Sequence, residues 1–449
     1  MSCLAGKHAV VVGAGIGGLA AAKSLAASFQ HVTVLDRDAL PREPGQRQGT
    51  PQARHAHVLL AGGQRALAAL FPGVEQELEQ AGAVKTRAGL DVLWERPGYD
   101  PYPRRDLGFI SLSISRPLLE FIVRRRLEQE GNVTLRPGCR VRELAMSPDR
   151  GAVVGIRCDG FDRREEVLAS DLVVDATGRP SLMTAMLDKV GLEQPPETEI
   201  GIDQTYATAN FEFTGDPGWL GLIHLPAAPD SGRGGFVFLL EHGRWIVSVC
   251  SKHGEPHPDD IDSFMAFVRE LRTPTIYNAI HNARPFGDVS RYALPASTRR
   301  HFERLAHFPR GLLAIGDSVC RFNPVFGQGM SVAAQEADAL RRLLAARAAL
   351  PDPLDGLAPE FFEEIQPLLA APWSTAETDF VYPQTRGDRP ADFAQRLRYG
   401  AALTQLAAED AAVHRLVFEV NSLLRPPSVL REPELVGRVT ALMAATAPP

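Results

Sequence analysis

The chain has 449 residues, a formal net charge of −6, and 45% hydrophobic and 23% charged residues. This composition is typical of a globular protein with room for two or three domains, and the negative charge argues against a protein built to coat nucleic acid. The five cysteines form no C-x-x-C pair and leave one over, so we expect neither a disulfide framework nor a zinc site. A reducing cytoplasm, small-molecule partners and no membrane span are the expectations that follow.

The N-terminal stretch "KHAVVVGAGIGGLAAAKSL" predicts a buried strand at 9–12, the spacing Gly13-x-Gly15-x-x-Gly18, and a helix. A second strand, "HVTVLDRD", ends on Asp36. Glycines between a strand and a helix, with an acidic residue about twenty positions on, are typical of a dinucleotide site. The first two glycines permit the turn and the approach of a pyrophosphate, the third permits helix–strand packing, and Asp36 would bind a ribose.

The segment "RQGTPQARHAHVLL" contains His55 and His57 in an H-x-H spacing. Two imidazoles at this spacing can bind a metal, but no third ligand lies nearby, so no metal site is predicted. Arg54 precedes a helix and has two interpretations, a phosphate or flavin-ring contact and a solvated surface arginine.

The middle of the chain predicts a helix after Arg116, strands at 133–135 and 139–144, and a buried strand at 172–174 that runs into Asp175-Ala-Thr-Gly178. Such strand ends are where an α/β sheet presents its backbone to a ligand. From about residue 200 the pattern alternates between apolar and polar residues, in "IDQTYATANFEF" and "GFVFLLEHGRWIVSVC". The alternation predicts antiparallel strands of a separate sheet, followed by helices at about 260–272 and after 351.

The stretch "GDSVCRFNPVFGQGMS" (316–331) places glycines and a proline before a helix. A ligand that contacts the backbone closely explains this pattern, and so does a tight structural turn.

Five blocks occur in one order along the chain: "TPQARHAHVLL…LFPG", "SRPLLEFIVRRRL", "DLVVDATGRPS", "GDSVCRFNPVFGQGMS" and "PWSTAETDFVYPQTRGDRP". With the N-terminal glycines they resemble the flavin-dependent monooxygenase superfamily that shares the p-hydroxybenzoate hydroxylase fold, and among its members the bacterial polyene and polyether epoxidases. The resemblance implies an α/β fold with three parts. A discontinuous Rossmann-like FAD-binding domain covers 1–85, 108–182 and 286–350, an antiparallel-sheet substrate domain covers 86–107 and 183–285, and a helical region covers 351–449.

The resemblance also implies which residues bind an extended FAD. The pyrophosphate loop is Gly13, Gly15, Ile16, Gly17 and Gly18; Asp36 and Arg37 lie at the ribose; Arg54 and Arg116 contact the cofactor; Val141 contacts adenine; Asp317 binds the ribityl and pyrophosphate region; Gly327, Gln328, Gly329 and Met330 hold the flavin pyrimidine; and Pro324 lies near C4a. We identify no catalytic side chain from the sequence.

Two departures from the superfamily pattern concern the electron source. Thr177-Gly178 replaces the Asp-Gly of a motif associated with nicotinamide, and Thr184 stands where its arginine would be. Cys320 replaces a common histidine. The resemblance therefore implies NAD(P)H as the electron source, either directly or through a separate flavin reductase.

The implied function is insertion of one oxygen atom from O2, through a flavin C4a-hydroperoxide, into an olefin of a secondary-metabolite substrate. Aromatic-ring hydroxylation and an oxygen-independent dehydrogenase or reductase are the alternatives. The halogenase signature W-x-W-x-I-P is only partly present, because Gly221 stands where the second tryptophan would fall. An apolar substrate pocket and plain core packing are both compatible with one aromatic set: Tyr206, Trp219, Phe236, Phe238, Phe322 and Phe326.

Overall fold

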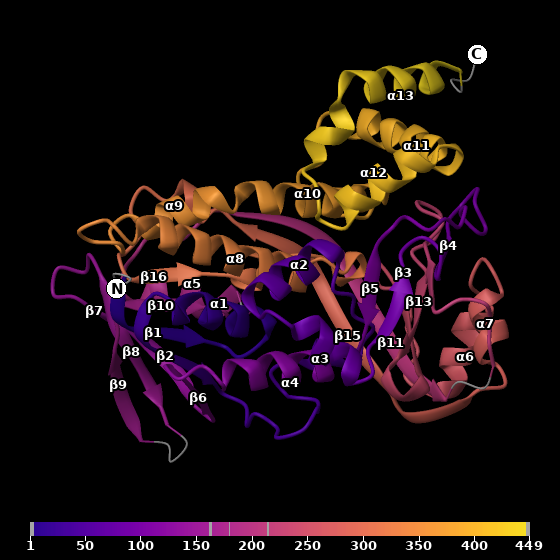
Figure 1. The fold of residues 1–449 in the computed structure, drawn as a ribbon. Coiled ribbons are helices and arrows are strands. Elements are labelled where there is room, and N and C mark those ends of the chain that lie inside the picture. Colours follow the sequence, from indigo (N-terminus) through magenta and orange to yellow (C-terminus); the bar gives the residue numbers. More distant parts are fainter. Residues whose placement is uncertain (1–3, 161–163, 179, 213–214, 446–449) are drawn as a thin grey trace.

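The computed structural model describes residues 4–160, 164–178, 180–212 and 215–445, and two large sheets organise it (Figure 1). One sheet is parallel and has five strands; the other has seven strands and is almost entirely antiparallel. The α/β fold class with a second antiparallel sheet is therefore confirmed. Phe213, the last residue of the predicted strand "IDQTYATANFEF", lies outside the described residues. Residues 1–3 and 446–449, at the two ends of the predicted domain ranges, lie outside them as well.

The parallel sheet has the strand order β16, β10, β1, β2, β6. The strands are β1 (Gly6–Val12), β2 (Phe29–Asp36), β6 (Val133–Pro137), β10 (Leu172–Asp175) and β16 (Leu312–Ala314). Val12 pairs with Asp175, and Asp175 pairs with Ala314, so segments far apart in the sequence end at the same edge of the sheet. In an open parallel sheet this carboxyl edge is where ligands bind.

Two helices that begin at this edge, α1 (Ile16–Ala26) and α8 (Gly329–Arg347), pack against each other. The Ser24 hydroxyl donates a hydrogen bond of 2.5 Å to the carbonyl of Ala337, and the small residues of both helices permit this close approach. Near the starts of the two helices, a Cβ on Gly17 would lie only 3.3 Å from the Cβ of Ala333, so the first turns of α1 and α8 are also close to one another.

Smaller elements surround the parallel sheet. They are α2 (Ala61–Leu70), α3 (Val74–Gln80), α4 (Arg116–Leu127) and α5 (Pro180–Lys189), the strand pair β3 (Val84–Arg87) and β5 (Ile110–Ser113), and the three-stranded sheet β7 (Arg140–Met146), β8 (Val153–Asp159) and β9 (Glu165–Ala169). Helix α4 begins where predicted, and Ser115 caps it by accepting a hydrogen bond from the Leu118 amide.

The seven-stranded sheet lies beside the parallel sheet, to its right in Figure 1. Its strands, in the order found across the sheet, are β17 (Cys320–Arg321), β15 (Arg284–Arg300), β11 (Glu197–Glu212), β14 (Arg244–Ser251), β13 (Gly234–Leu240), β12 (Gly221–His224) and β4 (Val92–Glu95). Segment 86–107 thus contributes a strand to this sheet, while the division of the chain into three domains stays a prediction.

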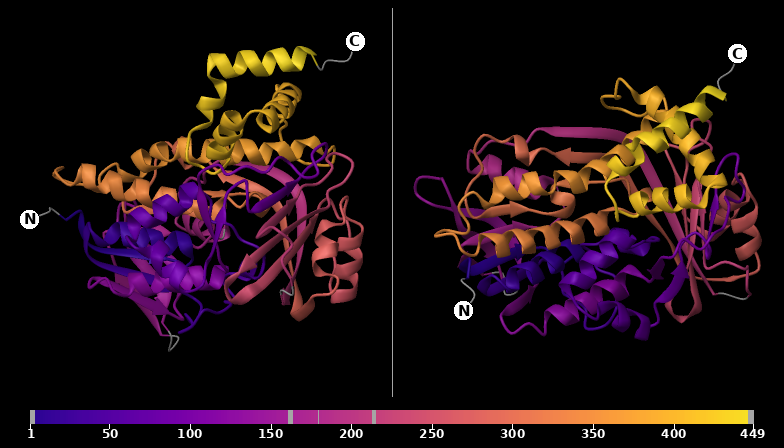
Figure 2. Two further views of the ribbon diagram at one scale, coloured as in Figure 1. Left: turned by 45° about the vertical axis from the view of Figure 1, so that its right-hand side comes forward. Right: turned by 45° about the horizontal axis from the view of Figure 1, so that its top comes forward.

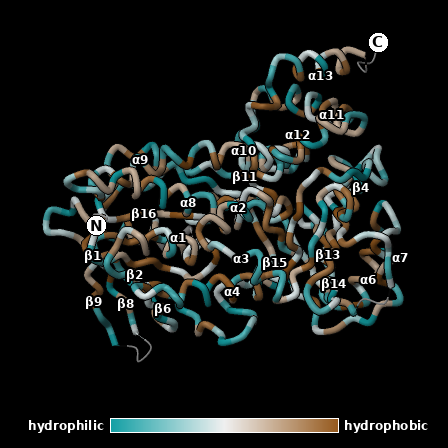
Figure 3. Tube along the Cα trace, in the orientation of Figure 1, coloured by the Kyte–Doolittle hydropathy of each residue, from teal (hydrophilic) through white to brown (hydrophobic). Residues whose placement is uncertain are grey.

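The two faces of this sheet have different neighbours, because side chains alternate along a strand. Val237 and Val247 point to the face covered by α6 (Ile261–Arg269) and α7 (Thr275–Ile280), whereas Phe236 and Phe238 point to the other face. Figure 3 shows hydrophobic residues along β13 and β14, consistent with a sheet buried on both faces.

Helices close the C-terminal part: α9 (Leu357–Glu364), α10 (Gln366–Ala376), α11 (Phe393–Glu409), α12 (Ala411–Asn421) and α13 (Pro433–Ala445). Helices α11, α12 and α13 share a hydrophobic cluster of their own around Leu403 and Val439, and they stand above the rest of the molecule in Figures 1 and 2. None of the described helices combines the length and the apolar character that crossing a membrane requires.

Candidate functional site

A cavity of about 1010 Å³ extends from the carboxyl edge of the parallel sheet, along one face of the seven-stranded sheet, to α11 and α12. Its volume is at the upper end of the range of about 300–1,000 Å³ that is typical of small-molecule sites. Most of the predicted cofactor residues line it: Gly13, Gly15, Ile16, Gly17, Asp36, Arg37, Arg116, Val141, Asp317, Pro324, Gly327, Gln328, Gly329 and Met330. Gly18 and Arg54 are not among the lining residues.

The glycines of the first loop have separate structural roles. Gly13 has φ +106°, and a Cβ on Gly18 would lie 1.9 Å from the carbonyl oxygen of Gly13, so both positions require glycine for helix–strand packing. A Cβ on Gly15 would meet no atom of the protein closer than 3.8 Å. Helix α1 begins at the next residue, and its N-cap, Gly15, provides no side chain, so the free amides of its first turn are available to an anion.

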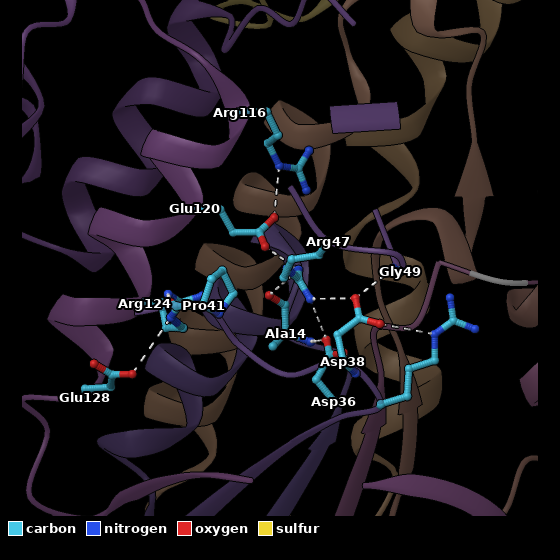
Figure 4. A network of polar contacts seen from close by, with 11 residues as sticks. Ala14, Asp36, Asp38, Pro41, Arg47, Gly49, Arg116, Glu120, Arg124 and Glu128 are labelled. Carbon is cyan, nitrogen blue, oxygen red and sulfur yellow. Dashed lines mark hydrogen bonds and ion pairs between the residues drawn. The ribbon is translucent and has the colours of Figure 1, made fainter. Parts of the chain in front are cut away.

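A network of buried charges lies beside this loop (Figure 4). Arg47 donates to Asp36 at 3.1 Å and to the Ala14 carbonyl at 3.1 Å, and it forms an ion pair with Glu120. Glu120 in turn accepts from Arg116 at 3.1 Å, so four charged side chains from three segments are joined. Burial alone would lower the pKa of Arg47, but Glu120 and Asp36 raise it above its ordinary value.

Asp36 is oriented by backbone amides as well as by Arg47. Its carboxylate accepts from the amides of Ala14 at 2.7 Å and Asp38 at 2.8 Å. A ribose hydroxyl would therefore meet a carboxylate whose position is already fixed.

Arg54, which we predicted to contact the cofactor, does not line the cavity. Its side chain is exposed, at the end of a short 3-10 turn, and the buried arginine of this region is Arg47. Arg47 lies in a polar loop without a recognisable motif, and only the fold shows that the loop returns to Asp36.

The second glycine-rich segment carries Asp317 on the cavity wall. Its carboxylate accepts no hydrogen bond from the described residues, and burial raises its pKa against the opposing effects of Arg321, Arg116 and Arg300. The side-chain oxygen of Gln328, immediately before α8, is buried and also has no partner within the described part of the chain. Polar atoms left unsatisfied beside a cavity are expected where a polar ligand completes them.

The residues present fit FAD. The amides before α1 suit a pyrophosphate, Asp36 and Asp317 suit hydroxyl groups, and the first turn of α8 offers free amides to the carbonyl groups of a flavin ring. These groups line one continuous cavity, as an extended dinucleotide requires.

Glu336 lies beneath the second loop, on α8, and is fully buried. Its carboxylate accepts from the Gly316 amide at 2.6 Å, while its other oxygen has no partner among the described residues. Burial raises the pKa of Glu336 to about 8, and Asp317 adds to the effect. This side chain is therefore protonated at neutral pH.

Asn323 fixes the loop that contains Pro324. Its side-chain oxygen accepts from Tyr206 at 2.9 Å and from the Val325 amide at 3.1 Å, and its amide group donates to Asp379 at 3.0 Å. Asp379 also pairs with the buried Lys252. The seven-stranded sheet and the C-terminal part thus hold the loop from opposite sides.

The far half of the cavity is largely apolar. Tyr206, Phe236, Phe238, Phe322 and Phe326 line it, as the pocket interpretation of the sequence requires. Trp219 does not line the cavity. The centres of the Trp219 and Trp245 rings are 5.1 Å apart, edge to face, and both residues lie in the core on the α6 side of the sheet. Trp219 precedes β12, and its position in the core on the α6 side puts it on the face of the sheet opposite to Phe236 and Phe238.

His55 and His57 both line the cavity. His55 is hydrogen-bonded through Nδ1 to Thr208 at 2.8 Å, and its buried Nε2 has no hydrogen-bond partner in the residues that the structure describes. Burial lowers the pKa of His55 to about 4, aided by Arg54, and burial with Arg116 lowers the pKa of His57 to about 3. No group of three or more His, Cys, Asp or Glu side chains suited to a metal ion occurs within the described ranges.

Comparison with known proteins gives one curated relative. Protein Rv3254 of Mycobacterium tuberculosis is 35% identical over 354 residues, which cover 76% of this chain and 73% of that protein. No protein-family model matches the chain.

Solved structures similar to this chain share its fold at low sequence identity. The flavin-dependent brominase Bmp2 has a TM-score of 0.66 at 15% identity and 98% coverage of both chains. The p-nitrophenol 4-monooxygenase PnpA of Pseudomonas putida has a TM-score of 0.66 at 19% identity, with 94% of this chain and 99% of that chain covered. PqsL of Pseudomonas aeruginosa, in complex with 2-aminobenzoylacetate, has a TM-score of 0.61 at 18% identity, with 84% and 98% covered. The chain therefore belongs to the family of the mycobacterial protein Rv3254. It shares its fold with the flavin-dependent brominase and with the two Pseudomonas proteins.

Proposed function

We propose that this protein is an FAD-dependent monooxygenase that inserts one oxygen atom of O2 into a small apolar substrate, with olefin epoxidation as its reaction. The observation that carries the proposal is the continuity of the cavity, which joins the cofactor-binding loops to the apolar face of the seven-stranded sheet. The second oxygen atom leaves as water, and the two electrons that this requires come from NAD(P)H.

FAD, when bound and reduced, supplies the activated oxygen. The protein contributes position and a dry environment. Asp36, Arg47 and the α1 amides hold the nucleotide half, Asp317 and the α8 amides hold the flavin half, and Asn323 keeps the Pro324 loop in one conformation. Tyr206, Phe236 and Phe238 offer the substrate a surface that excludes water.

The histidines that line the cavity favour an alkene over a phenol as substrate. A phenol requires a general base with a pKa near the working pH, whereas an alkene requires none. Burial depresses the pKa of His55 and His414 to about 4 and that of His57 to about 3, and His55 Nε2 is covered by protein. None of these imidazoles is tuned as a base at neutral pH.

The test is mass spectrometry of products formed under ¹⁸O2 from a matched panel of alkenes and phenols. We expect an epoxide that carries one ¹⁸O atom. A phenol product that carries ¹⁸O would move the assignment to ring hydroxylation. In a separate anaerobic reaction with an artificial electron acceptor, formation of an oxidised product would establish a dehydrogenase.

A further inference from the structure

The end of the cavity remote from the glycine loops contains an arginine, Arg96, that has no acidic partner among the described residues. Arg96 follows strand β4, and reciprocal backbone hydrogen bonds with Tyr99, of 3.1 and 2.8 Å, fix its backbone. Its side chain lines the cavity together with Tyr102, Thr404 and His414. Strand β4 and helices α11 and α12 therefore meet at this guanidinium.

The contacts of Arg96 leave most of its donors unused. Its guanidinium lies 5.4 Å from the centre of the Tyr102 ring, and one nitrogen lies 3.5 Å from the Thr404 hydroxyl. Throughout the described part of the chain no carboxylate forms an ion pair with it. The nearest acidic residues in sequence have partners of their own: Glu95 pairs with His224, and Asp100 pairs with Arg272.

Burial lowers the pKa of Arg96, and only Tyr102 and Tyr99 oppose this effect. Arg96 is half-buried. A cation that is partly withdrawn from water and has no counter-ion is less favourable than a solvated one, so this guanidinium suits an anion in the functional state.

The neighbouring cationic groups have other roles. Arg105 donates to the carbonyls of Ala407 and Ala408 and so caps the C-terminal end of α11. Burial, Arg105 and Arg96 lower the pKa of His414 to about 4, so its imidazole is neutral. Among the described residues that line the cavity, the acidic ones are Asp36 and Asp317, and both lie in the cofactor half.

We propose that Arg96 binds a carboxylate of the substrate, which makes the substrate an apolar acid. Its unsaturated or aromatic body would lie along Phe236 and Phe238, toward the Pro324 loop, and its carboxylate on the guanidinium. The inference rests on the proposed function, because it assumes that the substrate binds in the same cavity. A guanidinium suits this role because its planar set of donors matches the two oxygens of a carboxylate.

The experiment is titration calorimetry of the FAD-loaded protein with sorbate and 4-phenylbutanoate, each beside its primary amide. Because hydrogen bonds to charged groups are worth about 1.5–3 kcal/mol, we expect each acid to bind at least about tenfold more tightly than its amide. In Arg96→Gln the acids should lose about tenfold in affinity, while the amides change by less than about threefold. Arg96→Lys should retain part of the preference, and Arg398→Gln, at an exposed position on α11, should retain all of it.

Equal binding of acid and amide by the unaltered protein overturns the inference without any variant. A preference that survives in Arg96→Gln, with unchanged FAD content and melting temperature, overturns it as well. The readout is binding, so it is independent of the ¹⁸O2 experiment: acids can bind through Arg96 even if no oxygen is transferred, and oxygen transfer to neutral alkenes alone would refute only the role of Arg96.

Discussion

At the scale of single residues, Asp317 offers the cavity a carboxylate that no described side chain satisfies. We expect Asp317→Ala to weaken FAD binding by about 10- to 100-fold, because a buried hydroxyl of the cofactor would lose an acceptor worth about 1–3 kcal/mol. The measurement is the Kd of FAD for the apoprotein by fluorescence quenching. Asp388→Ala, at an exposed position, is the control, and equal affinity in the two variants contradicts the assignment.

Glu336 makes stability depend on pH. Its folded-state pKa of about 8 lies above the ordinary value of 4.5, so the folded state retains a proton that the unfolded state releases. The stabilisation is complete below about pH 4.5 and is lost as the pH rises through about 8, at up to about 1.4 kcal/mol per pH unit.

Urea unfolding at pH 5 to 8 tests this behaviour. We expect Glu336→Gln to flatten the decline in unfolding free energy, whereas Glu363→Gln, at an exposed position on α9, should leave it unchanged. Parallel pH profiles for Glu336→Gln and the parent would show that another group causes the decline.

At the scale of elements, two glycines at the start of α1 have different roles: we expect Gly15 to be required for cofactor binding and Gly18 for folding. Gly15 has room for a side chain within the protein, whereas a Cβ on Gly18 would overlap the Gly13 carbonyl. We expect Gly15→Val to fold with a normal circular dichroism spectrum but to purify with little FAD, and Gly18→Val to be destabilised by several kcal/mol or not to fold. Full FAD occupancy in Gly15→Val would refute the pyrophosphate assignment.

The elements also show what a sequence can and cannot predict. The strand–glycine–helix pattern around Gly13 and the alternation in β13 and β14 have local causes, and both appear in the structure as expected. Arg47 and Arg96 could not be predicted, because their roles depend on loops that return to Asp36 and to Thr404 from distant parts of the chain. Trp219 could not be placed for a related reason: it lies in a loop before β12, and only the fold shows that this loop puts its ring in the core on the α6 side of the sheet.

At the scale of the whole molecule, the next prediction concerns the source of the electrons that reduce the bound flavin. Thr177 and Thr184 replace the residues of the nicotinamide motif, so we propose that NADPH alone reduces the bound flavin too slowly for turnover and that a separate flavin reductase restores it. Anaerobic stopped-flow absorbance of the holoprotein measures the rate. Bleaching by NADPH as fast as turnover would show that this chain handles nicotinamide itself, and fast bleaching only with substrate would indicate gated reduction.

The strand order of the parallel sheet has a consequence for biosynthesis. Strand β1 leaves the ribosome long before β16, yet both pair with β10, and the chain between β10 and β16 contains β11 to β15 of the seven-stranded sheet. The nascent chain must therefore keep an unfinished parallel sheet until Leu312–Ala314 emerges, and pairing between such distant segments is slow and exposes unpaired strand edges. The Asp317 and Gly329 segments come later still, so the part of the cavity that they line is incomplete until they have emerged. A flavin cofactor could therefore not bind to a growing chain that has the first glycine loop but still lacks the second.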